Sequence, residues 1–247
     1  MKTLIHWSLA LGLIASPLIS TCLVQPLPVL ALPQAEIVGL LSGIPVFSLL
    51  NDKGSPIARQ VEDNKTVIPV FMSQKDAQQL LTQLKQKSPD IGNLYTVQVL
   101  PLGTIYDTIR KNSSPNKRLL LQYIPTITEI EEAKKLASAN GQEYRGDVPL
   151  YLVRIKSDRS YLTIEKDNKQ VVPVFFERAT VQEWIETVKK SKPDLAAEIQ
   201  VELVGLSDLI ANLEQQDNAL LKNIRFWPSE EMMQVIRANQ TKPQNQR

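Results

Sequence analysis

Carboxylates are the residues of this sequence best suited to chemistry, because other common catalytic side chains are scarce. The 247-residue chain has one histidine, His6, and one cysteine, Cys22, both within its N-terminal segment. The rest of the chain has neither residue type. It can therefore form no Ser-His-Asp triad, no Cys-His pair and no zinc site of histidine or cysteine ligands. Neither glycine-rich phosphate-binding motif, G-x-G-x-x-G or G-x-x-x-x-G-K-[ST], occurs. We therefore expect no enzymatic activity and no cofactor or metal.

Acidic residues do gather at two places in the sequence. Glu129, Glu131 and Glu132 fall in one predicted helix, and Glu230 and Glu231 fall in a second. Paired carboxylates can catalyse glycoside hydrolysis, but acids in the first turn of a helix are also favoured by the helix dipole. We prefer the second explanation. A carboxylate-dependent periplasmic hydrolase is the enzymatic alternative to a binding protein, and a structural scaffold subunit with one fixed partner is a third reading.

The N-terminal segment is typical of a secretory signal. It begins Met1-Lys2, continues with an apolar run over 4–19, and ends with a Val29-x-Ala31 pattern that suits cleavage. We expect residues 1–31 to be removed as a signal peptide, which leaves no membrane span. A lipid-modified start at Cys22 and an uncleaved anchor helix are the alternatives. The expected location is the periplasm, with the thylakoid lumen as a further possibility.

The charge balance gives no indication of a nucleic-acid partner. The chain has 28 basic and 26 acidic residues, and loss of 1–31 removes only Lys2 from these. A nearly neutral protein has no strong field to attract a polyanion. We expect no nucleic-acid binding.

An internal repeat is the most informative feature of the sequence. The segment 44–47 (IPVF) recurs at 148–151 (VPLY), and 67–71 (VIPVF) recurs at 171–175 (VVPVF), in both cases 104 positions further along. We predict two tandem, pseudo-two-fold-related copies of one α/β (α+β) unit, each a mixed sheet with helices packed on it. The expected divisions are a lead-in at 32–43, a first repeat at 44–140, a second repeat at 148–240 and a disordered tail at 241–247.

The two copies are expected to share one order of elements. Asp-Asn-Lys sequences before 66 and 170 favour hairpins, and apolar residues spaced three and four apart predict amphipathic helices. Pro69 and Pro173 cannot donate to a ladder, which implies an edge position or a bulge for their strands. The expected strands are 44–50, 56–61, 66–72, 96–102 and 118–124, then 148–155, 160–165, 170–176, 200–206 and 222–227; the expected helices lie around 77–84, 105–109, 126–139, 181–188, 209–213 and 229–238.

Six apolar residues are candidate contacts with a polypeptide partner. Methionine-rich or tryptophan-bearing surfaces adapt to many partners, and a doubled unit creates a seam that neither copy covers completely. Packing in the core would explain each position as well. The candidates are Met72, Phe176, Trp184, Trp227, Met232 and Met233.

Several short patterns, in order and doubled, resemble the Tic22 (Tic twenty-two) family. They are the IPVFSL segment at 44–49, the VIPVF segment at 67–71, and Pro125 and Pro228 before the last helix of each copy. That family includes a soluble component of the chloroplast inner-envelope translocon and relatives in photosynthetic bacteria. The resemblance implies a non-enzymatic, chaperone-like role in protein transport or outer-membrane protein biogenesis. The implied partners are unfolded or precursor polypeptides and the outer-membrane barrel-assembly machinery.

Overall fold

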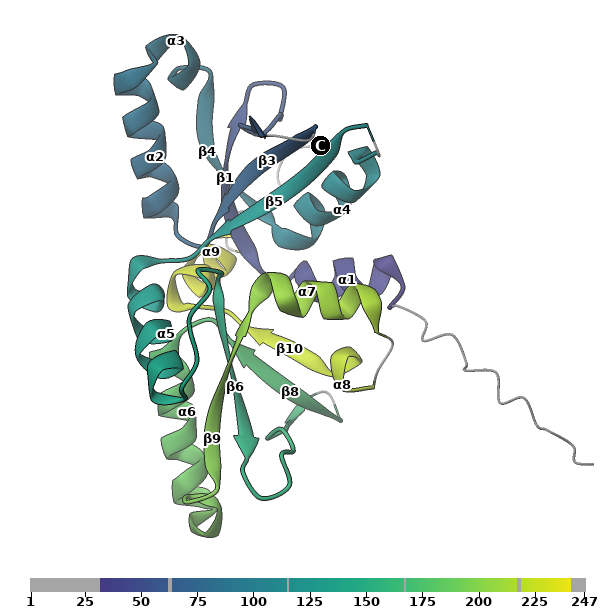
Figure 1. The fold of residues 1–247 in the computed structure, drawn as a ribbon, viewed down its shortest axis with the longest axis vertical. Coiled ribbons are helices and arrows are strands. Elements are labelled where there is room, and N and C mark those ends of the chain that lie inside the picture. Colours follow the sequence, from purple (N-terminus) through teal and green to yellow (C-terminus); the bar gives the residue numbers. More distant parts are fainter. Residues whose placement is uncertain (1–31, 62–63, 115, 167, 217–218, 241–247) are drawn as a thin grey trace, which may run out of the picture.

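The chain forms two lobes, and each lobe is a five-stranded mixed sheet with helices packed on it (Figure 1). The structure is a computed structural model that describes residues 32–240, apart from 62–63, 115, 167 and 217–218. The signal peptide expected at 1–31 and the tail expected at 241–247 lie outside the described residues. The tandem α/β architecture that the repeat predicts is confirmed; the predicted division into domains stays a prediction.

The first lobe contains sheet order β2-β3-β1-β4, with β5 paired to the other side of β3. The amphipathic pattern of its long helix α2 buries Ala77 and Leu81 against the sheet. In chain order the elements are α1 (Gln34–Leu41), β1 (Pro45–Asn51), β2 (Arg59–Val61), β3 (Lys65–Phe71), α2 (Gln74–Lys87), α3 (Pro89–Gly92), β4 (Tyr95–Pro101), α4 (Leu102–Asn112), β5 (Arg118–Ile124) and α5 (Ile127–Ala139).

The second lobe repeats this arrangement with sheet order β10-β8-β6-β9 and β7 paired to β8. Its long helix α6 buries Val181 and Ile185, four residues apart as in α2. The elements are β6 (Pro149–Ile155), β7 (Ile164–Lys166), β8 (Lys169–Phe175), α6 (Arg178–Ser191), the short helix η1 (Pro193–Leu195), β9 (Ile199–Gly205), α7 (Leu206–Gln215), α8 (Ala219–Lys222), β10 (Ile224–Trp227) and α9 (Glu230–Gln240).

Strand registers preserve the spacing of the sequence repeat. Phe47 lies opposite Phe71 in the first sheet, and Tyr151 lies opposite Phe175 in the second. Each residue of the second pair stands 104 positions after its counterpart. The two hairpins before β3 and β8 also match, since Asn64 and Asn168 both adopt positive φ, 55° and 58°, a conformation that asparagine tolerates.

The edge position expected for the two proline-containing strands is wrong. β3 lies between β5 on one side and β2 and β1 on the other. The Met72 N–H donates to Ile124 O of β5, so by alternation the Pro69 nitrogen faces the opposite side. On that side, residues 65–67 of β3 pair with β2, and Phe71 of β3 pairs with Phe47 of β1. Pro69 lies between these two paired parts of the strand. Proline is tolerated inside the sheet because it occupies this break in the ladder. The same holds for Pro173 in β8.

The final helices of the two lobes are exchanged. α5 closes the first repeat but packs on α6, β6 and β9 of the second lobe, where Leu136 contacts the cluster around Tyr151 and Phe175. α9 closes the second repeat but packs on β1, where Val235 contacts the cluster around Phe47 and Phe71. Each outer sheet face is therefore covered partly by a helix from the other repeat.

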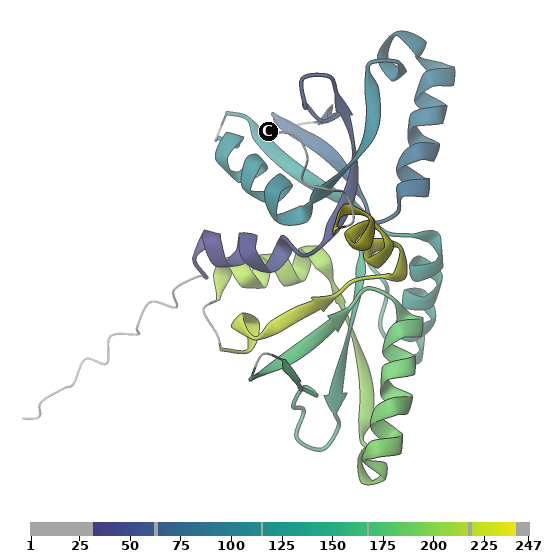
Figure 2. The ribbon, with the colours of Figure 1, turned by 180° about the vertical axis from the view of Figure 1, so that it is seen from behind.

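One shared core joins the inner faces of the two sheets. It includes Val46 and Val70 from the first lobe and Leu150 and Val174 from the second, all fully buried. α1, which the sequence analysis treated only as a lead-in, packs on α4 and α7 at this junction, and Figure 2 shows α1 and α7 side by side. Among the described residues, no helix is both long and apolar enough to cross a bilayer.

Candidate binding grooves at the seam

Glutamates from the exchanged helices cap the helices beside them. Glu231 of α9 accepts a hydrogen bond from the Gln74 N–H at the start of α2, at 2.7 Å. Glu129 of α5 accepts one from the Arg178 N–H at the start of α6, at 3.1 Å. Carboxylates satisfy the free N–H groups and the positive dipole end of a helix. These glutamates therefore fasten the two lobes together at the seam.

Glu129 is the most perturbed of these carboxyl groups. Burial raises its pKa, while hydrogen bonds from the Tyr151 hydroxyl, at 2.8 Å, and from the Arg178 N–H act in the opposite direction. Its neighbour Glu132 pairs instead with Lys135 on the exposed side of α5. Three of the five glutamates that suggest a hydrolase, Glu129, Glu132 and Glu231, are thus engaged in capping or in a surface ion pair.

Three of the six predicted contact residues meet in a small cavity at the seam. Met72, Phe176 and Met232 line a space of about 40 Å³ together with Glu129 and Glu231. All three apolar side chains are buried, with 5%, 4% and 1% of their surface exposed, and the Phe176 ring lies 5.8 Å from that of Phe226. The structure therefore places these three side chains in the interior at the seam. Their role in partner binding stays a prediction that would require this cavity to open.

The remaining three candidates lie on the second lobe and its last helix. Trp227 is 43% exposed and Trp184 is half-buried. Both rings lie against Phe175, with centroids 5.8 Å and 5.3 Å away. Met233 is half-buried on α9. Trp227 alone of the six exposes a large surface.

An apolar groove, here the β4 groove, lies between β4 and α9. It encloses about 360 Å³ and is lined by both repeats, since β4 belongs to the first repeat and Ile236 to α9, the last helix of the second. Val99 on β4 is 37% exposed. The lining residues are Ser42, Gly43, Pro45, Val99, Leu100, Pro101 and Ile236.

A second groove, here the β9 groove, occupies the equivalent place in the other lobe. It encloses about 540 Å³ and is lined by Leu203 and Pro149, the counterparts of Val99 and Pro45 at the same 104-residue offset. α5 takes the place of α9, again as the exchanged helix. The remaining wall is the connector 142–147 between α5 and β6, which brings charged side chains. The further lining residues are Ala137, Gln142, Glu143, Tyr144, Arg145, Asp147, Val204, Gly205 and Asp208.

Asp147 organises the end of the β9 groove. Its carboxylate accepts hydrogen bonds from the Val148 N–H at 2.7 Å and from the Ser207 N–H, also at 2.7 Å. The second bond caps the start of α7. The Tyr144 hydroxyl donates to the Asp147 carbonyl, and burial raises the pKa of Tyr144 to about 12. This network holds the connector beside β9.

Sequence reasoning missed the groove residues, although a signal for them exists. Val99 and Leu203 are apolar residues at repeat-equivalent positions in two of the predicted strands. The described residues contain no group of three or more His, Cys, Asp or Glu side chains placed to hold a metal ion.

The fold and the grooves define the chain as a pseudo-two-fold α/β protein with equivalent grooves beside β4 and β9. The chain matches the Tic22-like family over residues 14–238, and it therefore belongs to that family, as the sequence resemblance indicated.

Individual relatives agree with this assignment. A pea (Pisum sativum) protein, "Protein TIC 22, chloroplastic", is 21% identical over 203 residues, 79% of this chain and 75% of the pea protein. The solved structure of Anabaena Tic22, described as a protein of protein transport, has a TM-score of 0.73 and 24% identity, covering 84% of this chain and 97% of that one. Tic22 from Plasmodium falciparum has a TM-score of 0.61 and 20% identity, with 83% and 97% covered. At these identities the structures establish a shared fold.

Proposed function

We propose that this chain is a chaperone-like protein-transport factor of the periplasm, which binds apolar segments of unfolded precursor polypeptides without nucleotide or metal. The β4 groove is the observation that carries the proposal, because it combines an apolar lining with an open position between elements of both repeats. Its volume of about 360 Å³ lies within the roughly 300–1,000 Å³ of typical ligand pockets. Precursors of outer-membrane barrels and the barrel-assembly machinery are the proposed partners.

Membership of the Tic22-like family supports this proposal. The Anabaena relative is described as a protein of protein transport, and a transport factor must hold chains that have not yet folded. Such chains expose apolar side chains, whose burial contributes roughly 25 cal/mol per Å². A groove that holds a few such side chains gives weak, reversible binding, which suits a client that must be released.

Suppression of aggregation tests the proposal directly. The purified chain is mixed in increasing excess with an outer-membrane barrel protein diluted from urea, and light scattering is followed with and without ATP and with a chelator. We expect suppression that is the same in all three conditions. Val99→Lys should weaken it several-fold, because a charge in the groove disfavours apolar side chains. Leu94→Lys is the matched control, since Leu94 is 63% exposed and lies outside both grooves.

The alternatives predict other outcomes. No suppression at several-fold excess, or suppression that requires ATP, would contradict the proposal. A scaffold subunit would bind one fixed partner and ignore unfolded chains, which crosslinking in cells followed by identification of the trapped proteins would reveal. A hydrolase would turn over a sugar or ester substrate in the presence of the chelator.

A further inference from the structure

Strand β9 forms one edge of the sheet in the second lobe, and the backbone groups on its outer side are open. β9 pairs with β6 and, within the described ranges, with no other strand. The Leu206 N–H donates to Val148 O and the Lys156 N–H donates to Glu198 O. Even-numbered positions of β9 therefore face β6, because the direction of the backbone groups alternates along a strand.

It follows that the N–H and C=O groups of Val201 and Leu203, and the N–H group of Gly205, point outward from the sheet, whereas the Gly205 carbonyl belongs to the start of α7. Among the described strands, only β6 pairs with β9, on the opposite side from these groups. Unpaired edge groups of this kind are a template for an added strand. On β4 the counterpart of Gly205 is Pro101, which has no N–H, so β9 offers the more complete edge.

Two grooves run along this edge. The β9 groove touches the consecutive residues 203–205. A neighbouring hollow of about 430 Å³, here the basic groove, touches the consecutive residues 200–203. The β9 groove also touches Pro149 of β6, and the basic groove also touches Arg154, Ile155 and Lys156 at the end of β6, so both hollows extend from β9 towards its neighbouring strand. The two grooves share Gln142 and Leu203, so together they form one trough along β9.

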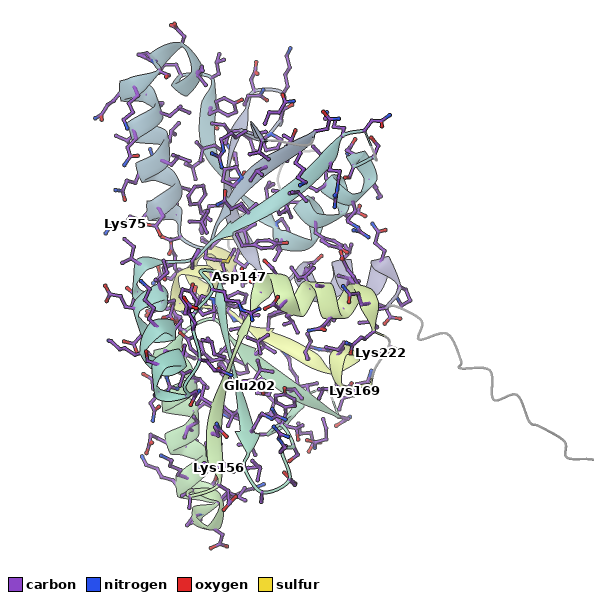
Figure 3. All side chains as sticks on the ribbon, viewed as in Figure 1. Lys75, Asp147, Lys156, Lys169, Glu202 and Lys222 are labelled. Atoms are coloured by element: carbon purple, nitrogen blue, oxygen red, sulfur yellow. The ribbon has the colours of Figure 1, made fainter. Side chains whose placement is uncertain are left out.

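Charge changes sign along the trough. At the Gly205 end the lining has three acidic residues and one basic residue, and at the Ile199 end it has three basic residues and one acidic residue. Figure 3 shows Asp147, Glu202 and Lys156 labelled in succession down this lobe. The acidic-end residues are Glu143, Asp147, Asp208 and Arg145, and the basic-end residues are Arg154, Lys156, Arg159 and Glu202.

We propose that the trough binds an extended segment of about seven residues from a partner polypeptide, which adds to β9 as an antiparallel strand with its carboxyl end beside Lys156. Backbone hydrogen bonds to Val201, Leu203 and Gly205 supply the recognition, and it is largely independent of sequence. The antiparallel direction follows from charge, because it places the amino end of the segment at the acidic end of the trough. The seven residues of β9 span about 24 Å at about 3.4 Å each.

A lone strand fits this edge better than a second copy of the chain. The connector 142–147 lies beside β9 and forms the outer wall of the trough, as Figure 1 shows between α5 and β6. If two copies paired through β9, each would bring its own connector to the same place. A partner segment without a flanking wall avoids that conflict.

A short peptide tests the proposal on the unaltered protein. The probe is a fluorescent eight-residue peptide of alternating threonine and valine, with an amino-terminal lysine and a free carboxyl terminus, and binding is read from anisotropy. Two isomers are N-methylated at alternate residues, one on each edge of the extended peptide. We expect one isomer to bind at least tenfold more weakly and the other to bind within about twofold of the parent. Equal binding by all three peptides would overturn the proposal.

Amide hydrogen exchange locates the bound strand. The peptide should slow the exchange of the Val201 and Leu203 amides and leave the equivalent Val97 and Val99 amides of β4 unchanged. Leu203→Pro, which removes one outward N–H, should abolish binding, whereas Val99→Pro should not, provided that both variants keep the wild-type circular dichroism. Amidation of the peptide carboxyl group, or Lys156→Ala, should weaken binding several-fold. Protection on β4 instead of β9, or a peptide-induced dimer, would contradict the assignment.

This inference rests on the proposed function for its kind of partner, but the two can fail separately. If Leu203→Pro suppresses aggregation as well as the wild type and all peptide isomers bind alike, clients bind the apolar β4 groove without strand addition. If the peptide adds to β9 while the chain suppresses no aggregation, the trough serves a specific partner segment and the chaperone proposal is wrong.

Discussion

The β4 and β9 grooves occupy the same place in two copies of one unit, yet their walls differ in chemistry. The strand side of each groove is equivalent, with Val99 matched by Leu203. The wall opposite comes from the segment that precedes the first strand of each lobe. In the first lobe this is a short turn at Ser42-Gly43 after α1, and in the second it is the charged connector 142–147.

The difference teaches that duplication preserved the sheets and left their joining segments free to diverge. Strand register cannot shift by one residue without turning every buried side chain outward, so β4 and β9 stayed alike. The connecting segments carry no such constraint. The two grooves therefore share an equivalent strand wall and differ in the connecting segment opposite it.

The largest expected effect is on the stability of the fold, and it tests whether the β4 and β9 grooves are separate surfaces. Phe176 lies in the cavity between the lobes and is 4% exposed. Phe176→Asp should destabilise the chain by about 4 kcal/mol or more, because it buries a charge and leaves a void. Urea unfolding followed by circular dichroism measures this. A folded variant with weakened client binding would show instead that the grooves continue through this cavity as one surface.

A glycine distinguishes the strand ends of the two grooves. A Cβ at Gly205 would lie 2.5 Å from the Asp147 carboxylate oxygen, so Gly205→Ala should displace Asp147 from the start of α7. We expect a loss of about 1–2 kcal/mol in the free energy of unfolding, the usual cost of a lost helix cap. Pro101→Ala at the equivalent position should cost less than about 1 kcal/mol. Equal losses would mean that Asp147 does not anchor the connector.

The polarity of the β9 groove should be convertible. Glu143 and Arg145 are exposed charged residues on its outer wall. Replacing both by leucine should give a second apolar hollow resembling the β4 groove, and the fluorescence of a bound apolar dye such as ANS should rise about twofold. The single change Val99→Lys in the β4 groove should lower the dye signal. An unchanged signal in the double variant would show that the groove is too open to hold apolar ligands.

The smallest expected effect concerns the caps on the two long helices. Because burial raises the pKa of Glu129 in the folded chain, the folded state retains a proton that the unfolded state has lost. The stability this provides is complete below the ordinary glutamate pKa of about 4.3 and is lost as pH rises through the folded pKa. Wild type should therefore lose stability relative to Glu129→Gln as pH rises above about 4.3. Parallel pH profiles in thermal melts would contradict this.

Much of the fold was predictable because the repeat fixes equivalent positions. The 104-residue offset relates the strand pair Phe47–Phe71 to the pair Tyr151–Phe175. Helical periodicity located α2 and α6. α1 escaped notice because its eight residues bury only Ile37 and Leu41, too few for a clear period. The break in the ladder at Pro69 depends on pairing with distant strands, which local patterns cannot reveal.

The candidate site was predictable only in outline. A doubled unit implies a seam, and Met72, Phe176 and Met232 do lie there. Apolar residues at a seam can be shared core or open surface, and composition alone does not separate the two. The grooves depend on how α9 and the connector 142–147 pass across the ends of β4 and β9, which is a property of tertiary packing.

The exchange of α5 and α9 makes the molecule comparable to a domain-swapped dimer sealed into a single chain. Either half expressed alone would fold its sheet without the helix that covers part of its outer face, and Phe47 or Tyr151 would lose part of that cover. Two such halves could recover their cover only by associating with each other. The linkage between the repeats therefore acts as an intramolecular tether that replaces a concentration-dependent assembly step, so the folded state does not depend on the concentration of the protein.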